Sequence, residues 1–288
     1  MVARSSRWNS GVMWMSGALF SFTLTAVGAR ELSDSLHTFQ TLFFRSLIGL
    51  LLLLPIFLYS GAYRQPLTQN LTLHGLRNVF HFLGQFGWFF GIGLLPLAEV
   101  FALEFTVPIW TLIIAAIFLK EPLTKSKLVA VCFGLIGVLV IVRPGLDIID
   151  PASFVVIGAA MGYAVAYVVT RSLAQVDSPI RILFFMCAMQ LPVALFCALP
   201  VWRSLQMMDW FWCFVVALTA LTAHFCIAKA MQQIEAGVVV TLDFLRLPLI
   251  AFIGVVFYHE GFDWWILLGG GLMLVGNIIN IRGQRAGE

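Results

Sequence analysis

The sequence predicts an all-helical integral membrane protein with ten transmembrane helices, arranged as two inverted five-helix repeats. The composition predicts the membrane environment: 61% of the 288 residues are hydrophobic and 11% are charged, whereas soluble domains carry about 25% charged residues. Apolar runs along the chain reach the roughly 20 residues that a helix needs to cross a bilayer. The two halves are predicted by an internal repeat with a period of 139 residues.

The repeat relates the stretch 96–143 to the stretch 235–282 without a gap. A fixed period of this kind indicates duplication. Each copy would hold five spans, and because five is an odd number, the second copy would cross the membrane in the opposite sense. We therefore expect one five-helix unit at 1–146 and its inverted copy at 147–288. The matched positions include Glu104 with Asp243, Glu121 with Glu260, Gly137 with Gly276 and Arg143 with Arg282.

Ten apolar runs are the predicted spans, and the short connections between them leave no room for a soluble domain. The first run resembles a signal peptide, because Arg4 and Arg7 precede it. It is longer than the 7–15 residues typical of a signal-peptide core, so we expect it to be a retained helix. The spans are Asn9–Ala29, Leu36–Ser60, Leu71–Gly93, Pro96–Leu119, Thr124–Val142, Ala152–Ala174, Pro179–Val201, Asp209–Gln232, Glu235–Tyr258 and Phe262–Ile281.

The distribution of Lys and Arg predicts the orientation, because cytoplasmic loops of membrane proteins carry an excess of both. With both termini in the cytoplasm, the outer face holds only Arg30, Arg143 and Arg203. The net charge of +3 is thus a matter of topology and does not indicate a nucleic-acid partner. The inner face then holds Arg4, Arg7, Arg64, Lys120, Lys125, Lys127, Arg171, Arg181, Lys229, Arg282 and Arg285.

In each half, an apolar helix is followed by a turn containing glutamate and then by a glycine-rich helix. This pattern resembles the EamA family of the drug/metabolite transporter superfamily. The resemblance implies a transporter of the bacterial-type inner membrane, with a central cavity lined by spans 1, 3, 4, 6, 8 and 9. Arg45, in span 2, lies outside that set, and we interpret it as structural. The residues that carry the resemblance are Arg45, Pro108, Lys120-Glu121-Pro122-Leu123, Gly134, Gly137, Pro248, His259-Glu260, Gly269-Gly270-Gly271 and Gly276.

Span 3 holds the first group of candidate substrate-binding residues. Polar side chains at membrane depth usually face a cavity or a partner. Arg77, His81 and Gln85 are four residues apart, so they share one helical face, and Trp88 continues that face. His224 of span 8 is the repeat equivalent of Gln85. We predict a polar wall of the substrate site; the alternative is hydrogen bonding that holds the helices together.

The second group lies in spans 4, 6 and 9. Glu104 and Asp243 occupy matched positions of the two halves, which predicts a shared central site. Arg246 is eleven residues past the start of its span, about 17 Å deep at helical rise. Its planar fork suits a substrate carboxylate, and the alternative is a static pair with Asp243. Tyr163 and Trp110 are candidate aromatic walls of the same cavity.

Other chemistry is not indicated. The five cysteines fall in apolar runs without a close CxxC pair, so we expect no disulfide, no metal site and no cofactor. Phosphate-loop, zinc-protease and nucleophile-elbow motifs are absent from the sequence, which argues against an enzyme. The glycines of span 10 indicate close helix packing, either within the bundle or between copies in a homo-oligomer.

Inverted repeats are a recurring design of secondary transporters, with the site near the midplane. We therefore expect a permease that works by alternating access on a small amphipathic metabolite. The mixed cavity suits an amino acid or a related carboxylate, and the resemblance to the EamA family implies efflux as its direction. The alternatives are uptake of an aromatic vitamin such as riboflavin or of another metabolite, and transport of a lipid-linked head group. A membrane enzyme or receptor is disfavoured, since the chain has neither a catalytic constellation nor a soluble domain.

Overall fold

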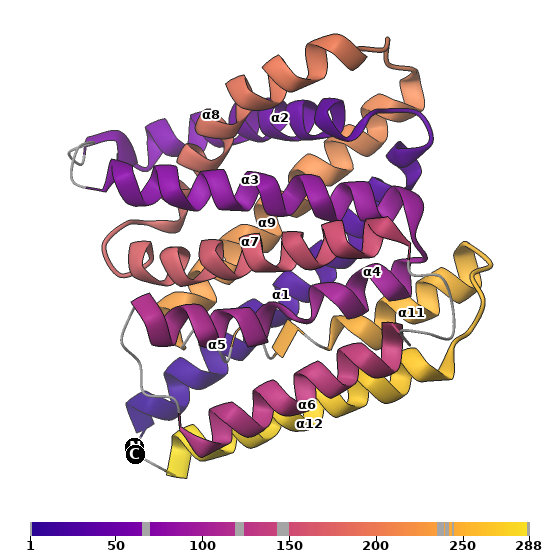
Figure 1. The fold of residues 1–288 in the computed structure, drawn as a ribbon. Coiled ribbons are helices and arrows are strands. Elements are labelled where there is room, and N and C mark those ends of the chain that lie inside the picture. Colours follow the sequence, from indigo (N-terminus) through magenta and orange to yellow (C-terminus); the bar gives the residue numbers. More distant parts are fainter. Residues whose placement is uncertain are drawn as a thin grey trace.

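The structure is a computed structural model that describes residues 2–64, 70–118, 124–142, 150–234, 239, 242–243 and 245–286. These residues form helices and connecting turns, without a strand. The long helices lie side by side in one bundle, and the start of α1 and the end of α12 lie at the same end of it (Figure 1). The predicted turn at Lys120-Glu121-Pro122, and also Arg143, Glu235 and Phe244, lie outside the described residues.

Most of the predicted spans each correspond to one helix. The α-helices are α1 (Val2–Ser33), α2 (Thr38–Tyr59), α3 (Leu71–Leu94), α4 (Leu97–Glu104), α5 (Val107–Phe118), α6 (Lys125–Val142), α7 (Pro151–Leu173), α8 (Pro179–Ala198), α9 (Met207–Gln233), α11 (Arg246–Phe257) and α12 (Trp264–Ala286). Two short 3-10 helices are η1 (Ala62–Arg64) and η2 (Leu199–Val201).

Side chains that cap the first turn define where several helices begin. Asp150 precedes α7 and accepts a hydrogen bond from Ala152 N at 2.8 Å. Ser178 precedes α8 in the same way and accepts from Arg181 N at 3.3 Å. A proline follows each of these caps, at the first helical position, where its missing N–H leaves no hydrogen bond unmade. These caps explain why α7 and α8 begin close to their predicted starts.

Six helices among the described residues are long and apolar enough to cross a membrane. Helix α3 has the length, but His74, Arg77, Asn78, His81 and Gln85 make it more polar. The all-helical class of multi-pass membrane protein is therefore confirmed, while the number of ten crossings remains a prediction. The six are Trp8–Ser33, Thr38–Tyr59, Leu97–Phe118, Pro151–Leu173, Pro179–Val201 and Met207–Gln233.

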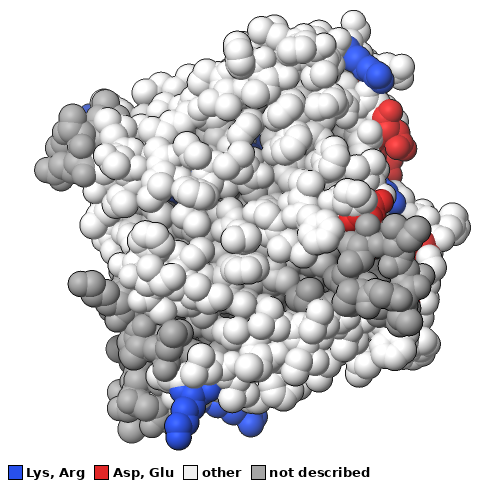
Figure 2. Space-filling model, viewed as in Figure 1, with Lys and Arg blue, Asp and Glu red and all other residues white. Residues whose placement is uncertain are grey.

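The surface agrees with this class. Figure 2 shows a face that is almost wholly uncharged, with Lys, Arg, Asp and Glu confined to its edges. Exposed large apolar side chains, such as Phe20, Leu83 and Phe154, lie on the long helices. An apolar surface of this extent would be unstable in water but suits the hydrocarbon core of a bilayer.

Four helix pairs make the most extensive contacts: α1 with α9, α3 with α7, α2 with α8, and α6 with α12. Each pair joins a helix from the first half of the chain to one from the second. Glycines allow the close approach of α6 and α12, since a Cβ on Gly137 would lie 2.7 Å from Gly269 O, and one on Gly276 would lie 3.1 Å from Ala130 O. Gly276 of the last span thus packs within the bundle, whereas Gly271 has no neighbour within 4 Å of its Cβ position.

One predicted span differs from expectation. The run Pro96–Leu119 reads as a continuous helix, but the structure divides it into α4 and α5, with a break at Phe105 and Thr106. The reason is Pro108, which has no N–H to donate to the carbonyl of Glu104, four residues earlier. Thr106 instead turns back on α4, with N and Oγ1 donating to Leu103 O at 3.1 and 2.9 Å.

Candidate functional site

Two small cavities lie between the helices at the centre of the bundle, with volumes of about 20 and 10 Å³. Such volumes hold about one water molecule each, so neither cavity holds a metabolite without expanding. Tyr163, Tyr167 and His224 line both cavities, which are therefore adjacent. The larger one is also lined by Phe22, Thr25, Arg45, Gln85, Trp88, Phe89, Glu104, Ala220 and Arg246, and the smaller one by Arg77, His81, Ala166, Thr170, Ile182, Ile227 and Ala228.

The larger cavity is bordered by a buried charged trio from both halves of the chain. Arg246 Nη2 lies 2.6 Å from Asp243 Oδ2 and 3.0 Å from Glu104 Oε1. The other oxygen of Glu104 accepts a hydrogen bond from Trp88 Nε1 at 2.7 Å. The Arg246 guanidinium lies 4.8 Å from the ring centre of Phe22 and 4.7 Å from that of Phe101. One guanidinium thus faces two carboxylates, so the trio carries a formal charge of −1.

The trio depends on where two helices begin and end. Glu104 is the last residue of α4, at the break that Pro108 produces, and Arg246 is the first residue of α11. A helix dipole disfavours an anion at the C-terminal end and a cation at the N-terminal end. Both residues therefore occupy unfavourable helix ends, and their mutual contact offsets this. Asp243 Oδ1 and Arg246 Nε are buried without a hydrogen-bond partner, which leaves polar capacity at the site.

A hydrogen-bond network of neutral side chains from α3 and α8 lies beside the cavities and binds Arg45. With its amide oxygen toward Arg45, Gln85 accepts from Arg45 Nε, Nη1 and Nη2 at 3.2, 2.6 and 2.9 Å, and its amide nitrogen donates to Gln190 Oε1 at 2.7 Å. Gln190 Nε2 lies 3.0 Å from His81 Nδ1 and 3.2 Å from Asn78 Oδ1. Because an amide donates to His81 Nδ1, we infer that the ring proton is on Nε2.

His81 presents that second nitrogen without a partner. His81 is 2% exposed, and Nε2 is buried without a hydrogen bond. Its ring centre lies 4.7 Å from that of His224 and 5.7 Å from that of Tyr163. His224 in turn packs edge-on against Phe22 at 5.3 Å. A buried N–H donor beside a cavity and two more polar rings can bind a polar ligand atom.

The structure brings most of the predicted site residues together. The two exceptions are Asp243 and Trp110, which line neither cavity. Asp243 is nevertheless ion-paired with Arg246, which does line the larger one. Trp110 packs instead against the buried cluster of Val107, Ala160 and Ala164, and its Nε1 donates to Thr106 Oγ1 at 3.1 Å. Whether any of these residues binds substrate remains a prediction. Those that line a cavity are Arg77, His81, Gln85, Trp88, Glu104, Tyr163, His224 and Arg246.

Arg45 corrects an expectation. The expectation places it outside the cavity, but it lines the larger cavity and binds Gln85 there; its structural role remains a prediction. Three further residues at this site, Phe22, Phe101 and Gln190, are not among those predicted from the sequence. A charged or amide side chain within an apolar run, as at Arg45 and Gln190, is a signal that could have identified two of these four. The two phenylalanines resemble many others in the chain and carry no such signal.

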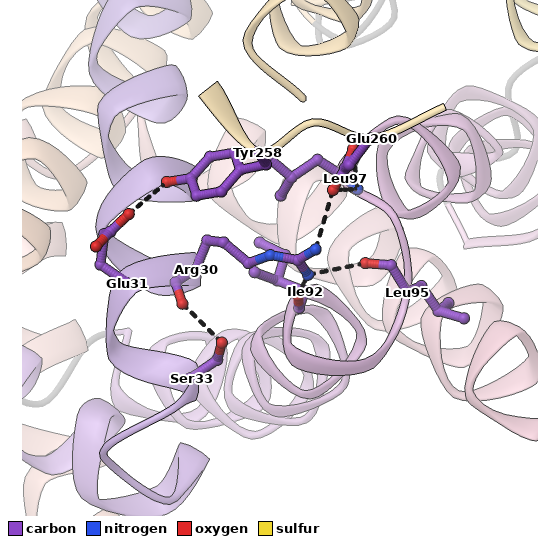
Figure 3. Close-up of polar contacts among 8 residues, drawn as sticks. All are labelled: Arg30, Glu31, Ser33, Ile92, Leu95, Leu97, Tyr258 and Glu260. Carbon is purple, nitrogen blue, oxygen red and sulfur yellow. Dashed lines mark hydrogen bonds and ion pairs between the residues drawn. The ribbon is translucent and has the colours of Figure 1, made fainter. Parts of the chain in front are cut away.

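A second polar cluster closes one end of the bundle, where α3 ends and α4 begins (Figure 3). We call it the Arg30 cluster: Arg30 with Ile92, Leu95, Leu97 and Glu260. Arg30 Nη1 donates to Leu95 O at 3.0 Å and also to Ile92 O, while Nη2 lies 3.0 Å from Glu260 Oε1. Both oxygens of Glu260 accept from Leu97 N at 3.0 Å. The cluster thereby ties α1, the α3–α4 turn and the α11–α12 turn together.

The opposite end of the bundle has a counterpart. Arg171, near the end of α7, donates from Nη1 to Ile234 O at 3.1 Å and also to Met231 O, at the end of α9. Met231 and Ile234 follow Ile92 and Leu95 by the repeat period of 139 residues. One arginine therefore binds the carbonyl end of α3 and another that of α9. Glu121, the repeat equivalent of Glu260, lies outside the described residues.

Comparison with known proteins identifies relatives over nearly the whole chain. The EamA-like transporter family matches residues 9–143 and 151–282. An S-adenosylmethionine uptake transporter of Rickettsia bellii is 23% identical over 96% of this chain and 94% of the relative. A riboflavin transporter of Vibrio cholerae is 25% identical over 83% of this chain and 82% of the relative. A riboflavin transporter of Brucella anthropi is 27% identical over 85% of this chain and 88% of the relative.

A solved crystal structure has a similar fold. The TM-score is 0.73, with 97% of this chain and 99% of the other covered, at 18% sequence identity. At that identity the likeness concerns the fold alone. The helical arrangement described above thus has an experimental counterpart.

Proposed function

The chain belongs to the EamA-like transporter family, and we propose that it takes up a small amphipathic metabolite across a bacterial inner membrane by alternating access. Family membership makes it a transporter rather than an enzyme. Its relatives named as S-adenosylmethionine and riboflavin transporters favour a substrate of that size, and the first of these names favours uptake. Efflux of an amino acid, a direction that only the family resemblance implied, is the competing hypothesis.

The observation that carries the proposal is the charged trio at interrupted helices. Discontinuous helices that meet near the midplane are a recurring feature of transporter sites. Here α4 stops at Glu104 and α11 starts at Arg246, and the two residues come from different halves of the chain. Charge at membrane depth is costly and usually functional. The trio and the aromatic rings beside it would contact a ligand with both polar and apolar parts.

Several contacts support the inverted repeat of ten spans, with units at 1–146 and 147–288. Under the repeat, the pairing of α1 with α9 corresponds to that of α7 with α3, and both pairings occur. The arginines at 30 and 171 bind matched carbonyl groups, and the glycines at 137 and 276 approach matched positions on α12 and α6. The start of α1 and the end of α12 share one end of the bundle, in accord with two cytoplasmic termini (Figure 1).

The small central cavities and the two arginine contacts support alternating access. The Arg30 cluster would close the outer end, and the contact of Arg171 with α9 would close the inner end. Opening either end requires breaking only the contacts at that end. A substrate bound between the two ends would then be accessible from one side of the membrane at a time. Inverted-repeat transporters achieve this when one half rocks against the other.

The test is transport by the purified protein in proteoliposomes. We expect saturable uptake of radiolabelled S-adenosylmethionine or riboflavin above that of protein-free vesicles, and loss of uptake in Glu104→Gln. Export of preloaded amino acids, without uptake of either probe, would reverse the proposed direction. Translocation of labelled phospholipid head groups alone would make the protein a lipid carrier. No transport in any of these assays would contradict the proposal.

A further inference from the structure

Two arginines of the membrane interior have no acidic partner. Arg45 of α2 and Arg77 of α3 are 3% and 2% exposed. Neither forms an ion pair with any residue in the described part of the chain. Arginine keeps its proton in proteins, and a buried charge without a partner is costly. Two such charges beside one cavity system need an explanation.

Neutral groups hold both arginines in place. Arg45 binds the amide oxygen of Gln85, as described above. Arg77 Nε donates to Thr170 Oγ1 at 2.9 Å, and Nη1 donates to Asn78 Oδ1 at 3.1 Å. These acceptors orient the guanidinium groups, but they do not neutralise them. The charge therefore remains available to a ligand.

The hydrogen-bond network of Gln85, Gln190 and Asn78 connects the two arginines, and both arginines line a cavity. Gln85 donates to Gln190, and Gln190 donates to Asn78, so an unbroken chain of neutral side chains runs from Arg45 to Arg77. Arg45 lines the larger cavity and Arg77 the smaller one. Because the cavities share three lining side chains, an anion between them could contact both arginines after a small expansion.

The nearby carboxylates are already bound elsewhere. Asp177 lies 2.9 Å from His74 and 3.3 Å from Arg181. Glu104 and Asp243 both bind Arg246. Positive charge is therefore concentrated at Arg45 and Arg77, whereas the trio at the other side of the larger cavity has a formal charge of −1.

We propose that Arg45 and Arg77 form an anion subsite that binds the carboxylate of the transported metabolite. This inference rests on the proposed function and narrows its substrate class to zwitterions that carry a carboxylate and, at the trio, a cationic group. Arg246 then serves to position Glu104 and Asp243 rather than to bind the substrate carboxylate. Guanidinium forks suit a carboxylate because they can donate two parallel hydrogen bonds.

A first experiment needs no knowledge of the substrate. The probes are sodium acetate and acetamide, which have nearly the same shape but differ in charge, at equal ionic strength. A ligand that binds the folded state raises its melting temperature. We expect acetate to raise the melting temperature of the wild type by roughly 2–4 °C more than acetamide does. Arg45→Gln and Arg77→Gln should each abolish the difference, while Arg203→Gln, which changes an exposed arginine, should retain it.

The opposite results would overturn the subsite. These are an equal effect of acetate and acetamide on the wild type, or an acetate effect in the two variants as large as in Arg203→Gln. If a glutamine variant fails to fold, Arg45→Lys and Arg77→Lys keep the charge without the fork. Their acetate effect should then be smaller than that of the wild type, and an unchanged effect would again overturn the subsite.

A second experiment separates this inference from the proposed function. In proteoliposomes, wild-type protein should prefer S-adenosylmethionine over its decarboxylated analogue by about tenfold or more. Arg45→Gln and Arg77→Gln should bring that ratio near one, mainly by slowing uptake of the carboxylate-bearing probe. An unchanged ratio in both variants would overturn the subsite. If the wild type transports no probe while the acetate difference is present, the proposed function fails and the anion subsite stands.

Discussion

Arg246 holds two carboxylates through a single nitrogen, and this arrangement limits what it can do for a ligand. A substrate carboxylate would approach a group of three charges whose sum is negative. The same geometry makes Arg246 important for stability, because removing one member of a buried charge network leaves another without compensation. We therefore propose that the interior arginines differ in role although their residue type is the same.

Variants of the trio separate stability from transport. Arg246→Ala should destabilise the fold by about 3–5 kcal/mol, since it leaves two buried carboxylates unpaired. The double variant Asp243→Asn with Arg246→Gln should recover most of the melting temperature, because Glu104 keeps its bond to Trp88. It should nevertheless lose most transport in proteoliposomes. Normal flux through the folded double variant would remove the trio from the transport site.

His81 allows a matched pair of substitutions that act on one ring nitrogen each. His81→Asn keeps an acceptor near the Nδ1 position, which binds Gln190, and removes Nε2, which has no partner. We expect this variant to melt like the wild type and to transport poorly. His81→Gln should do the reverse and lose stability, by about 1–3 kcal/mol for the unsatisfied amide. Melting curves and transport rates of both variants decide between a ligand-binding and a structural role of His81. Normal transport by His81→Asn would show that the role is purely structural.

Residue patterns could predict much of this site but not its partners. Spacing by four placed Arg77, His81 and Gln85 on one face, and the repeat placed His224 opposite them; the structure brings these side chains to the cavities. The same spacing could not reveal that Gln85 binds Arg45, because that contact joins two helices through tertiary packing. The family resemblance implied a cavity without span 2, so it placed Arg45 outside the site.

At the scale of the element, the break between α4 and α5 fixes the position of Glu104. Hydropathy does not detect it, since the run from Leu97 to Phe118 is apolar throughout and could cross a membrane as one helix. Pro108 was visible in the sequence, but proline within a transmembrane helix can also produce only a kink, as Pro55 and Pro192 sit inside continuous helices. What distinguishes the break at Pro108 from a kink is the tertiary contact of Glu104 with Arg246, which no pattern in the sequence reveals.

Pro108→Ala tests the importance of the break. Alanine restores the N–H that the carbonyl of Glu104 lacks, so α4 and α5 can join into one helix. Joining would turn Glu104 away from Arg246, and transport should fall severalfold. Pro55→Ala makes the same chemical change at a lipid-exposed position of α2 and should leave transport unchanged. Wild-type flux in Pro108→Ala would show that the break has no part in transport.

The Arg30 cluster and its counterpart at Arg171 should act in opposite directions. Glu260→Gln removes the charge that holds Arg30, and partly exposed pairs contribute up to about 1 kcal/mol, which corresponds to about a fivefold shift in conformation. A cysteine at Thr25 in the cavity should therefore react severalfold faster with an impermeant reagent added outside. Arg171→Gln should slow that reaction. Glu31→Gln, which contacts only Tyr258 in this region, is the control. Equal rates in all variants would exclude the cluster as a gate.

At the scale of the whole molecule, the proposed duplication would relate contacts that no single helix explains. The period of 139 residues was visible in the sequence, and it relates contacts that are far apart in the chain, such as those at Gly137 and Gly276. The pairing of α1 with α9 and of α3 with α7 could not be read from hydropathy, because apolar faces do not specify their partners. It follows from side-chain packing between the halves.

Access to the cavity from both sides of the membrane tests the central claim most directly. Thr25 lines the larger cavity and is 3% exposed, so we place a single cysteine there in a protein without native cysteines. Cysteines at Gly261 and Lys125, exposed at opposite ends of the bundle, report the topology and should react only from outside and only from inside, respectively. Alternating access predicts that the cysteine at Thr25 reacts with impermeant reagent from either side and that substrate slows both reactions. Complete reaction from one side with none from the other, at saturating reagent, would contradict it.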